Sequence, residues 1–394
     1  MHVVFLKPKK EESVRRFHPW VFSGAIQKIE GQPSEGDLVK VLDSQGNFLG
    51  IGHFQQGSIM VRLLSFQEEP IDENFWKNRI AEAYQMRKVL GLMIQNRNNC
   101  YRLVHGEGDG LPGLIVDVYG NTAVMQAHSV GMHKIRNVLA KCVVECVPEI
   151  QYLYYKSEAT LPFRNENAPE DGYLIGGDSE QFVVMENGLK FFVDWQHGQK
   201  TGFFLDQREN RVLLERYASD RIVLNMFCYT GGFSVYALRG NAKLVHSVDS
   251  SAKAIELTDK NVALNFSDNR HQSFAEDAFK YLQLYEKRAP FYDLIILDPP
   301  AFAKHRDAVP NALKGYRKLN RKAFEIIRPG GIIFTFSCSQ AITREQFRQA
   351  VFSAAAESKR NVRILHQLSQ GTDHPINIYH PEGEYLKGLV LWVE

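Results

Sequence analysis

Residues 225–234 read Asn-Met-Phe-Cys-Tyr-Thr-Gly-Gly-Phe-Ser. This stretch begins within an apolar run of residues that favour β-strands, Ile222–Phe227, and continues into a turn that contains Gly231 and Gly232. Two adjacent glycines let the backbone turn tightly and come close to a ligand before a helix begins. The pattern predicts a strand-to-helix turn of a parallel α/β sheet.

Strands alternate with helical stretches from about Leu189 onward, which predicts a doubly wound parallel sheet. Continuous apolar runs are typical of strands that helices cover on both faces. Besides the first strand, we expect strands at Leu244–Val248, Tyr292–Leu297, Gly331–Phe336, Val362–Leu368 and Gly388–Val393.

Acidic residues follow two of the strands, at the edge where open α/β sheets bind ligands. Asp249 ends the second strand, where a carboxylate can accept hydrogen bonds from both ribose hydroxyls. Asp277 suits an adenine amino group, with Glu276 as the alternative. The glycine loop lacks the GxGxxG pattern that cradles a pyrophosphate, so we expect S-adenosylmethionine (SAM), which carries no phosphate. The structural alternatives are a turn without a ligand and, for Asp249, a helix N-cap.

The expected SAM site, together with two strands that follow the βαβ core at Val362–Leu368 and Gly388–Val393, predicts a C-terminal class I (Rossmann-like) SAM-dependent methyltransferase domain over residues 189–394. Residues 1–70 contain short strands between glycine turns, which predicts a small β-barrel. Residues 71–188 contain an amphipathic linker helix and a middle α+β domain with a helix near His133–Cys146. The segment Leu161–Gly177 reads as a surface loop. The expected fold class is therefore α/β with two smaller N-terminal domains.

The motif Asp298-Pro-Pro-Ala-Phe302 follows the strand that ends at Leu297. Its prolines favour an extended turn, in which Asp298 can bind the polar edge of a base and Phe302 can stack on it. Cys338 follows the next strand at the same edge. Methylation of a pyrimidine at carbon 5 requires a nucleophile to add at carbon 6, and a thiolate is suitable. The alternatives are a capping aspartate and a buried packing cysteine.

Lys200 or Arg208 can pair with the carboxylate of the methionine part of SAM. Asp206 and Glu209 predict a capping box that opens a helix at Arg208. The expected catalytic residues are Cys338 and Asp298. The expected cofactor-binding residues are Lys200, Thr201, Arg208, Phe227, Tyr229, Gly231, Asp249, Asp277 and Asp298.

The composition argues against a membrane-spanning protein and against a disulfide-rich secreted protein. The chain has 44% hydrophobic and 23% charged residues, and no run approaches the ~20 apolar residues of a membrane span. We expect a soluble, cytoplasmic protein without a signal peptide. Five cysteines with irregular spacing predict free thiols. Cys142 and Cys146 lack a second pair of suitable spacing, so no metal is expected.

A net charge of +2 does not by itself indicate nucleic-acid binding, which requires a clustered basic face. Residues 304–328 contain such a cluster beside the Asp298 motif, on a helix with one apolar and one cationic side. Its cations are either phosphate contacts or a solvated face. They are Lys314, Arg317, Lys318, Arg321 and Lys322.

Three further segments are characteristic: His18-Pro-Trp-Val-Phe-Ser-Gly-Ala25, Gly106-Glu-Gly-Asp-Gly-Leu-Pro-Gly-Leu114 and Lys200-Thr-Gly-Phe-Phe-Leu-Asp-Gln-Arg208. With them, the chain resembles the bacterial 23S ribosomal RNA large-subunit cytosine-5 methyltransferase family over essentially its full length. That family combines a PUA domain, a middle domain and a SAM-binding domain. The resemblance implies that the PUA-like barrel binds RNA, that Asp249 and the glycine loop bind SAM, and that Cys338 is the attacking thiol.

Other similarities leave alternatives open. Relatives with a similar catalytic domain methylate a ring nitrogen of guanine, and Asp-Pro-Pro-aromatic motifs resemble those of amino-group methyltransferases. Better-known RNA cytosine-5 methyltransferases carry Pro-Cys where this chain has Pro299-Pro300, which leaves Cys338 alone and the proton-abstracting base unidentified. We therefore expect 5-methylcytosine formation through a thiolate adduct, with guanine methylation or a non-catalytic SAM-bound RNA-binding protein as alternatives. The sequence is compatible with a homodimer.

Overall fold

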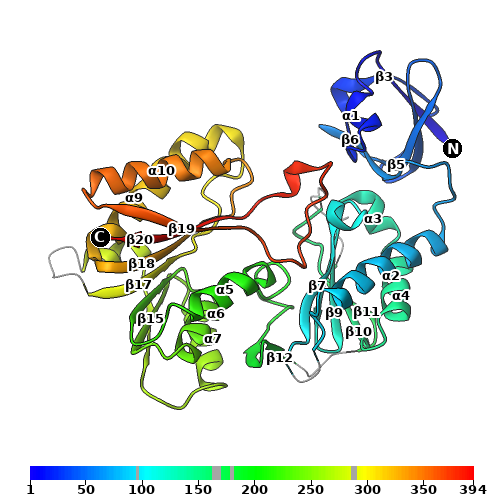
Figure 1. The fold of residues 1–394 in the computed structure, drawn as a ribbon. Coiled ribbons are helices and arrows are strands. Elements are labelled where there is room, and N and C mark those ends of the chain that lie inside the picture. Colours follow the sequence, from blue (N-terminus) through cyan, green and yellow to red (C-terminus); the bar gives the residue numbers. More distant parts are fainter. Residues whose placement is uncertain (95–96, 162–169, 178–181, 285–290) are drawn as a thin grey trace. The chain divides into compact units, whose positions relative to one another are not determined.

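The computed structural model describes residues 1–94, 97–161, 170–177, 182–284 and 291–394. The chain forms two compact units (Figure 1). Unit 1 comprises Met1–Gly188, Val193–Leu205 and Thr372–Gly383, and unit 2 comprises Leu189–Phe192, Asp206–Gly371 and Glu384–Glu394. Two segments that follow residue 188 thus also belong to unit 1. The division into three domains at residues 70 and 188 stays a prediction.

The N-terminal part of unit 1 is a six-stranded sheet in the order β2-β6-β5-β4-β1-β3. Only the pairing of β1 with β4 is parallel among those described here. Alternate residues of β4 are buried, so Val39 and Val41 contribute to an apolar core with Val61 of β6. The elements are β1 (His2–Leu6), α1 (Glu12–Arg15), β2 (Trp20–Phe22), η1 (Ser23–Ala25), β3 (Ile26–Glu30), β4 (Leu38–Leu42), β5 (Phe48–Phe54) and β6 (Ile59–Ser65). The predicted short-strand region is confirmed.

The middle of unit 1 is a five-stranded sheet in the order β11-β10-β9-β8-β7. Helices α2 and α4 pack against each other beside this sheet (Figure 1). The Asp72 side chain caps α2 by accepting a hydrogen bond from the Phe75 amide. The elements are α2 (Glu73–Val89), β7 (Cys100–His105), η2 (Gly106–Asp109), β8 (Leu114–Tyr119), β9 (Thr122–Ala127), α3 (Val130–Lys134), α4 (Arg136–Cys146), β10 (Tyr152–Tyr155), β11 (Gly172–Ile175) and β12 (Val183–Glu186).

Two predictions for this region are wrong in detail. The single helix expected near His133–Cys146 is two helices, α3 and α4, because Ile135 leaves the helical conformation between them. The segment Leu161–Gly177 contains strand β11, which pairs with β10, so it is not all loop. Residues 162–169 of that segment lie outside the described residues.

A buried polar network joins the late segments of unit 1 to the middle sheet. The Arg102 guanidinium donates to both carboxylate oxygens of Asp117, at 2.7 and 2.8 Å. Asp117 also accepts a hydrogen bond from the Thr201 hydroxyl at 2.6 Å, and the Arg102 amide donates to Asp373 at 2.9 Å. Asp117 is fully buried, so its charge requires these partners. The network therefore anchors residues 193–205 and 372–383.

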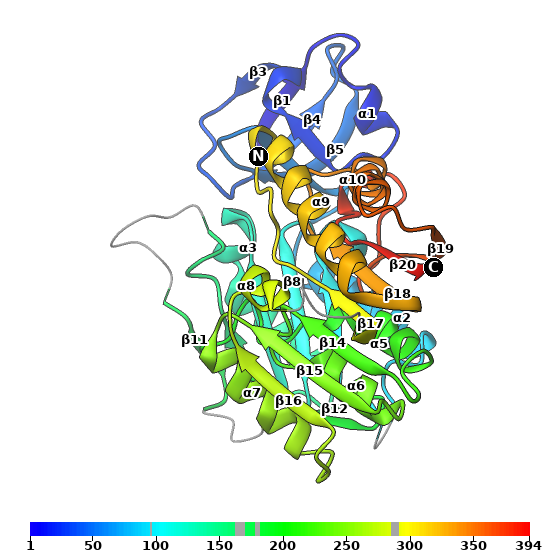
Figure 2. The same ribbon diagram turned by 90° about the vertical axis from the view of Figure 1, so that its left-hand side faces the viewer.

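Unit 2 contains a seven-stranded sheet in the order β16-β15-β14-β17-β18-β20-β19, with its first five strands parallel and β20 antiparallel to both neighbours (Figure 2). This confirms the predicted α/β fold. Strand β16 precedes Glu276 and Asp277, as the placement of these residues at the carboxyl edge implied, although no residues were named for it because it has no continuous apolar run. The strands of this sheet are β14 (Ile222–Met226), β15 (Leu244–Asp249), β16 (His271–Ala275), β17 (Tyr292–Leu297), β18 (Ile327–Ser337), β19 (Val362–Leu368) and β20 (Lys387–Val393). Strand β13 (Leu189–Phe192) also belongs to unit 2 but lies outside this sheet.

Helices cover both faces of this sheet (Figure 1). On one face, Tyr316, Leu319 and Phe324 of α9 are fully buried in the main apolar core of the unit. Helices α5 and α6 pack against each other, and α6 also contacts α7. The helices are α5 (Arg208–Glu215), α6 (Gly232–Arg239), α7 (Ala252–Ala263), α8 (Ala278–Gln283), η4 (Arg306–Ala308), α9 (Val309–Ile326) and α10 (Arg344–Glu357). Two further short 3-10 helices lie wholly or partly in unit 1: η5 (Pro381–Gly383) belongs to it, and η3 (Leu205–Gln207) begins at its last residue before unit 2.

The predicted capping box of α5 is wrong. Gln207 is the N-cap residue, and no side chain makes a capping hydrogen bond there. Asp206 precedes the N-cap, and its carboxylate accepts a hydrogen bond from the Tyr385 hydroxyl at 2.6 Å. Helix α10 does have a capping box, between Thr343 and Gln346. Among the described residues, none of the helices combines the length and the apolar character needed to cross a bilayer.

Candidate cofactor and catalytic site

The loop after β14 has an unusual backbone. Phe227, Tyr229 and Gly231 have positive φ angles of 59°, 48° and 75°. Such angles are unfavourable for side chains other than glycine and concentrate at functional sites. A Cβ atom at Gly231 would lie 2.7 Å from the Thr258 methyl group, so this position requires glycine. The loop therefore presents backbone atoms at the carboxyl edge of the sheet, as a ligand loop does.

Asp249 connects this loop to the end of β15. One carboxylate oxygen accepts a hydrogen bond from the Tyr229 amide at 3.0 Å, and the other accepts from the Ser251 amide at 2.9 Å. Helix α7 is capped by the Ser251 side chain, so the alternative of Asp249 as a helix N-cap is wrong. The half-buried carboxylate keeps acceptor capacity on both oxygens, which fits the two hydroxyls of a ribose.

Asp277 is the N-cap of α8. One of its oxygens accepts hydrogen bonds from the Phe279 and Lys280 amides, both at 3.0 Å. The neighbouring Glu276 amide donates to the Asp249 carbonyl oxygen at 2.9 Å, which places both acidic residues at the end of β16 next to β15. The capping role partly explains why the sequence has an acidic residue at position 277. Its contact with adenine stays a prediction.

Cys228 lies inside the loop but is not exposed. Its side chain is buried, and burial raises the pKa of the thiol to about 12. Its sulfur lies 3.6 Å from the Thr258 hydroxyl. The geometry therefore supports a packing role for Cys228.

Asp298 lies half-buried at the end of β17. Its carboxylate accepts a hydrogen bond from the Gln207 side-chain amide at 3.0 Å. The Gln207 carbonyl oxygen in turn accepts from Asn210 at 2.6 Å, which fixes the orientation of the amide. The start of helix α5 thus holds the carboxylate that ends a central strand.

Cys338 follows β18, the strand next to β17. The pair Leu297 and Thr335 fixes the parallel register of these strands, so Asp298 and Cys338 emerge at the same edge, as predicted. The Cys338 sulfur contacts the Pro299 carbonyl oxygen at 3.9 Å and is partly exposed. A thiol in this position can reach a substrate in front of the sheet.

Phe302 is less available than expected for stacking on a base. Its ring centroid lies 4.6 Å from that of Tyr316, and a Cβ atom at Gly315 would lie 3.1 Å from the Phe302 ring. The Tyr316 hydroxyl contacts the hydroxyls of Ser337 and Ser339, on either side of Cys338. Phe302 therefore packs on Tyr316, whose hydroxyl contacts the two serines that flank Cys338.

The remaining predicted cofactor residues are divided between the units. Arg208 is buried at the start of α5 in unit 2. Lys200 and Thr201 belong to unit 1, where the Lys200 ammonium lies 4.7 Å from the centre of the Phe204 ring. The Thr201 hydroxyl is buried on Asp117, so it has a structural role there. Cofactor contacts of these residues stay predictions.

Comparison with known proteins identifies the family. Residues 159–375, more than half of the chain, match the family described as S-adenosylmethionine-dependent methyltransferase, and residues 4–66 match a PUA-like domain. The chain is 40% identical over 390 residues to a ribosomal RNA large subunit methyltransferase I of Alteromonas mediterranea, and 41% identical over 393 residues to that of Tolumonas auensis. Each alignment covers 98% of both proteins. The chain belongs to this methyltransferase family.

Solved structures support the fold of the methyltransferase. A SAM-dependent methyltransferase from Streptococcus mutans superimposes with a TM-score of 0.85 at 24% identity, covering 100% of both chains. A methyltransferase complexed with SAH superimposes with a TM-score of 0.87, also at 24% identity and with 100% coverage of both chains. The family matches show that SAM is the cofactor and that the N-terminal barrel is PUA-like, as expected.

The cationic side of α9 in this methyltransferase is largely paired with acidic residues. Arg317 and Arg321 both lie close to Glu357 of α10, at 3.4 and 3.9 Å. Lys318 lies over the Phe279 ring, and Lys322 pairs with Glu325 at 3.6 Å. These pairs reduce the charge available for phosphate, so a structural role accounts for much of the predicted cluster.

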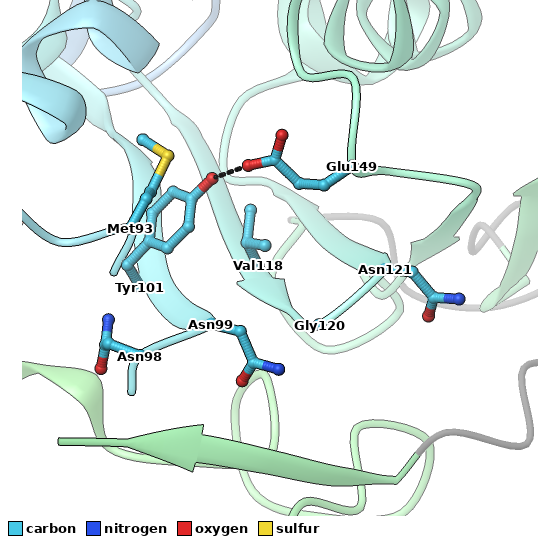
Figure 3. Close-up of a pocket in the computed structure, with 8 residues that line it drawn as sticks. All are labelled: Met93, Asn98, Asn99, Tyr101, Val118, Gly120, Asn121 and Glu149. Carbon is cyan, nitrogen blue, oxygen red and sulfur yellow. Dashed lines mark hydrogen bonds between the residues drawn. The ribbon is translucent and has the colours of Figure 1, made fainter. Parts of the chain in front are cut away.

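A separate pocket of about 400 Å³ opens in unit 1 (Figure 3). The Glu149 carboxylate is held there by the hydroxyls of Tyr101 and Tyr84, at 3.1 and 2.8 Å. None of the predicted site residues lines it. Its lining residues are Met93, Asn98, Asn99, Tyr101, Val118, Gly120, Asn121 and Glu149.

Sequence reasoning missed three residues of the site. Gln207 binds Asp298, Thr258 encloses the Gly231 turn, and Lys387 of β20 donates to the carbonyl oxygen next to Cys338. Each of these residues is distant in sequence from its partner, so no local sequence motif predicts the contact. Among the described residues, no group of three or more His, Cys, Asp or Glu side chains is arranged to hold a metal ion.

Proposed function

We propose that this methyltransferase forms 5-methylcytosine in 23S ribosomal RNA, with Cys338 as a covalent nucleophile. The RNA substrate is supported by the relatives, which are named ribosomal RNA large subunit methyltransferase I. The observation that carries the chemistry is the contact between the Cys338 thiol and the Pro299 carbonyl oxygen, at 3.9 Å. It sets a nucleophile beside Asp298, the residue that suits the polar edge of a base.

The remaining residues have separate proposed roles. Asp249 binds the ribose hydroxyls of SAM, and Asp277 receives the adenine amino group. Arg208 or Lys200 pairs with the methionine carboxylate, because a guanidinium or ammonium group is the natural partner of a carboxylate. Phe227, Tyr229 and Gly231 complete the proposed cofactor-binding surface of unit 2.

SAM supplies an electrophilic methyl group when it is bound. Cys338 adds as a thiolate to carbon 6 of the cytosine, which forms a C–S bond and makes carbon 5 nucleophilic. Asp298 holds the polar edge of the base, so that carbon 5 faces the methyl group. Transfer to carbon 5 would break the bond between the sulfur of SAM and its methyl group and leave S-adenosylhomocysteine. Carbon 5 then loses its proton to a base, the C–S bond to Cys338 breaks and the Cys338 thiolate leaves. The aromatic ring is thereby restored.

The wider context follows from the substrate. The PUA-like barrel contacts the RNA, and a ribosomal RNA substrate corresponds to a cytoplasmic enzyme. In a three-domain division, residues 1–70, 71–188 and 189–394 form the barrel, the middle domain and the catalytic domain. The protein is proposed to act alone or as a homodimer, which sedimentation of the intact chain will distinguish.

The deciding experiment measures transfer of radioactive methyl groups from SAM to ribosomal RNA, followed by nuclease digestion to identify the modified nucleoside. We expect labelled 5-methylcytidine. Labelled methylguanosine would establish the nitrogen-methylation alternative, and no label with intact SAM binding would establish a non-catalytic RNA-binding protein.

The role of Cys338 is tested by trapping. Fluorine at carbon 5 of cytosine cannot leave as the proton does, so RNA with 5-fluorocytosine should hold the enzyme in a covalent complex. We expect this complex with the wild type and with Cys228→Ala, and none with Cys338→Ala. Full activity of Cys338→Ala would exclude the covalent route.

A further inference from the structure

We propose that Lys387 is a positioning residue for Cys338, whose thiolate is stabilised by the Lys387 ammonium group. This inference rests on the proposed role of Cys338 as a nucleophile. It assigns a function to a buried lysine of β20 that the sequence did not single out.

Lys387 contacts both residues that flank Cys338 in the sequence, Ser337 and Ser339. In the antiparallel pairing of β18 with β20, Lys387 lies opposite Ser337, the residue before the cysteine. Its Nζ atom donates to the carbonyl oxygen of Ser339, the residue after the cysteine, at 2.6 Å. The side chain is 3% exposed, so the ammonium group cannot turn into solvent. A positive charge is therefore fixed at the end of β18.

A buried ammonium group is costly unless a negative charge lies nearby. Burial lowers the pKa of Lys387 to about 8, and the strongest opposing influence is the charge of Cys338, followed by that of Glu384. Glu384 is already paired with Arg344, the first residue of α10. The thiolate of Cys338 is thus the anion that the Lys387 ammonium group stabilises.

The other titratable groups nearby do not take this role. Tyr316 of α9 contacts Ser337 and Ser339, but burial raises the pKa of its hydroxyl, so it stays neutral. Asp298, after β17, accepts a hydrogen bond from Gln207. Arg344 is cationic, and it opposes protonation of Lys387. Among these groups, Cys338 is therefore the one whose negative charge most favours the protonated form of this lysine.

The test is alkylation of Cys338 by iodoacetamide across pH 5.5–9.5, followed by mass spectrometry of the peptide that contains Cys338. Only the thiolate reacts, so the profile reports its population. Lys387→Gln retains a donor for the Ser339 carbonyl oxygen but removes the charge. We expect the midpoint of its profile to rise by about one pH unit, which is about tenfold less thiolate at pH 7. Lys387→Arg should stay near the wild-type profile.

Lys243→Met is the matched control, because Lys243 is exposed immediately before β15, at the opposite edge of the same sheet. It should leave the profile unchanged. An unshifted profile in a folded Lys387→Gln protein would overturn the proposal, and Lys387→Met offers a second uncharged variant if the first does not fold. Alkylation needs neither RNA nor methyl transfer, so a Lys387 effect remains measurable even if the trapping experiment rejects covalent catalysis.

Discussion

Gln207 donates a hydrogen bond to Asp298 at 3.0 Å and thereby links the start of α5 to the end of β17. Gln207 is buried and Asp298 is half-buried, and a hydrogen bond to a charged group contributes about 1.5–3 kcal/mol. If Asp298 orients the target base, this contact should matter for the rate more than for cofactor binding.

We predict that Gln207→Leu lowers kcat by about 10- to 100-fold, the rate equivalent of that free energy. The Kd for SAM, measured by calorimetry, should change less than about threefold. Gln272→Leu on the exposed face of β16 is the control and should retain full activity. An unchanged kcat in Gln207→Leu would show that Asp298 needs no such support.

Asp249→Asn should weaken SAM binding. The amide retains one acceptor oxygen, whereas the carboxylate accepts from the Tyr229 and Ser251 amides with separate oxygens. We expect the Kd for SAM to rise at least about tenfold, corresponding to the loss of one charge-assisted hydrogen bond. Titration calorimetry with SAM measures this change. Asp220→Asn, at the opposite edge of the sheet before β14, should bind SAM normally.

Gly231→Ala should destabilise unit 2 and impair SAM binding. The new Cβ atom would lie 2.7 Å from the Thr258 methyl group, and alanine at a φ of 75° adds about 1–3 kcal/mol of backbone strain. We expect the Tm to fall by several degrees in a thermal unfolding experiment. Adding Thr258→Ser removes the methyl group, so the double variant should recover part of the loss. No recovery would mean that backbone strain alone is responsible.

His53 should make unit 1 less stable in acid. It is 5% exposed and stacks on Trp76, and burial lowers its pKa from 6.5 to about 4. Between these values the unfolded chain binds a proton that the folded chain does not, so the free energy of unfolding falls as pH decreases from about 6.5 to 4. Above pH 6.5 this histidine contributes no pH dependence.

The measurement is urea unfolding followed by tryptophan fluorescence, because three of the four tryptophans, Trp20, Trp76 and Trp195, belong to unit 1. His53→Phe should reduce the slope of stability against pH by up to about 1.4 kcal/mol per pH unit between pH 4 and 6.5. Equal slopes for variant and wild type would show that His53 is protonated without cost in the folded protein.

Several features could be predicted from the sequence because they depend on neighbouring residues. Apolar runs identified the central strands, and paired glycines identified the turn after β14. Since parallel strands end at a common edge, the positions of Asp249, Asp298 and Cys338 after their strands were enough to group them. The helix break at Ile135 and the capping of α5 were not predicted. At α5 a contact distant in sequence decides the outcome, because Asp206 accepts a hydrogen bond from Tyr385.

By itself, the sequence determined the α/β class, the order of the strands along the chain and the acidic and thiol side chains at their ends. Only the tertiary structure decided that Gln207 supports Asp298, that Lys387 lies beside Cys338, and that residues 193–205 and 372–383 join unit 1. Periodicity is a local property that short windows of sequence record. The partner of a buried charge often lies in a segment that is distant in sequence. Such contacts cannot be predicted from the local spacing of residues.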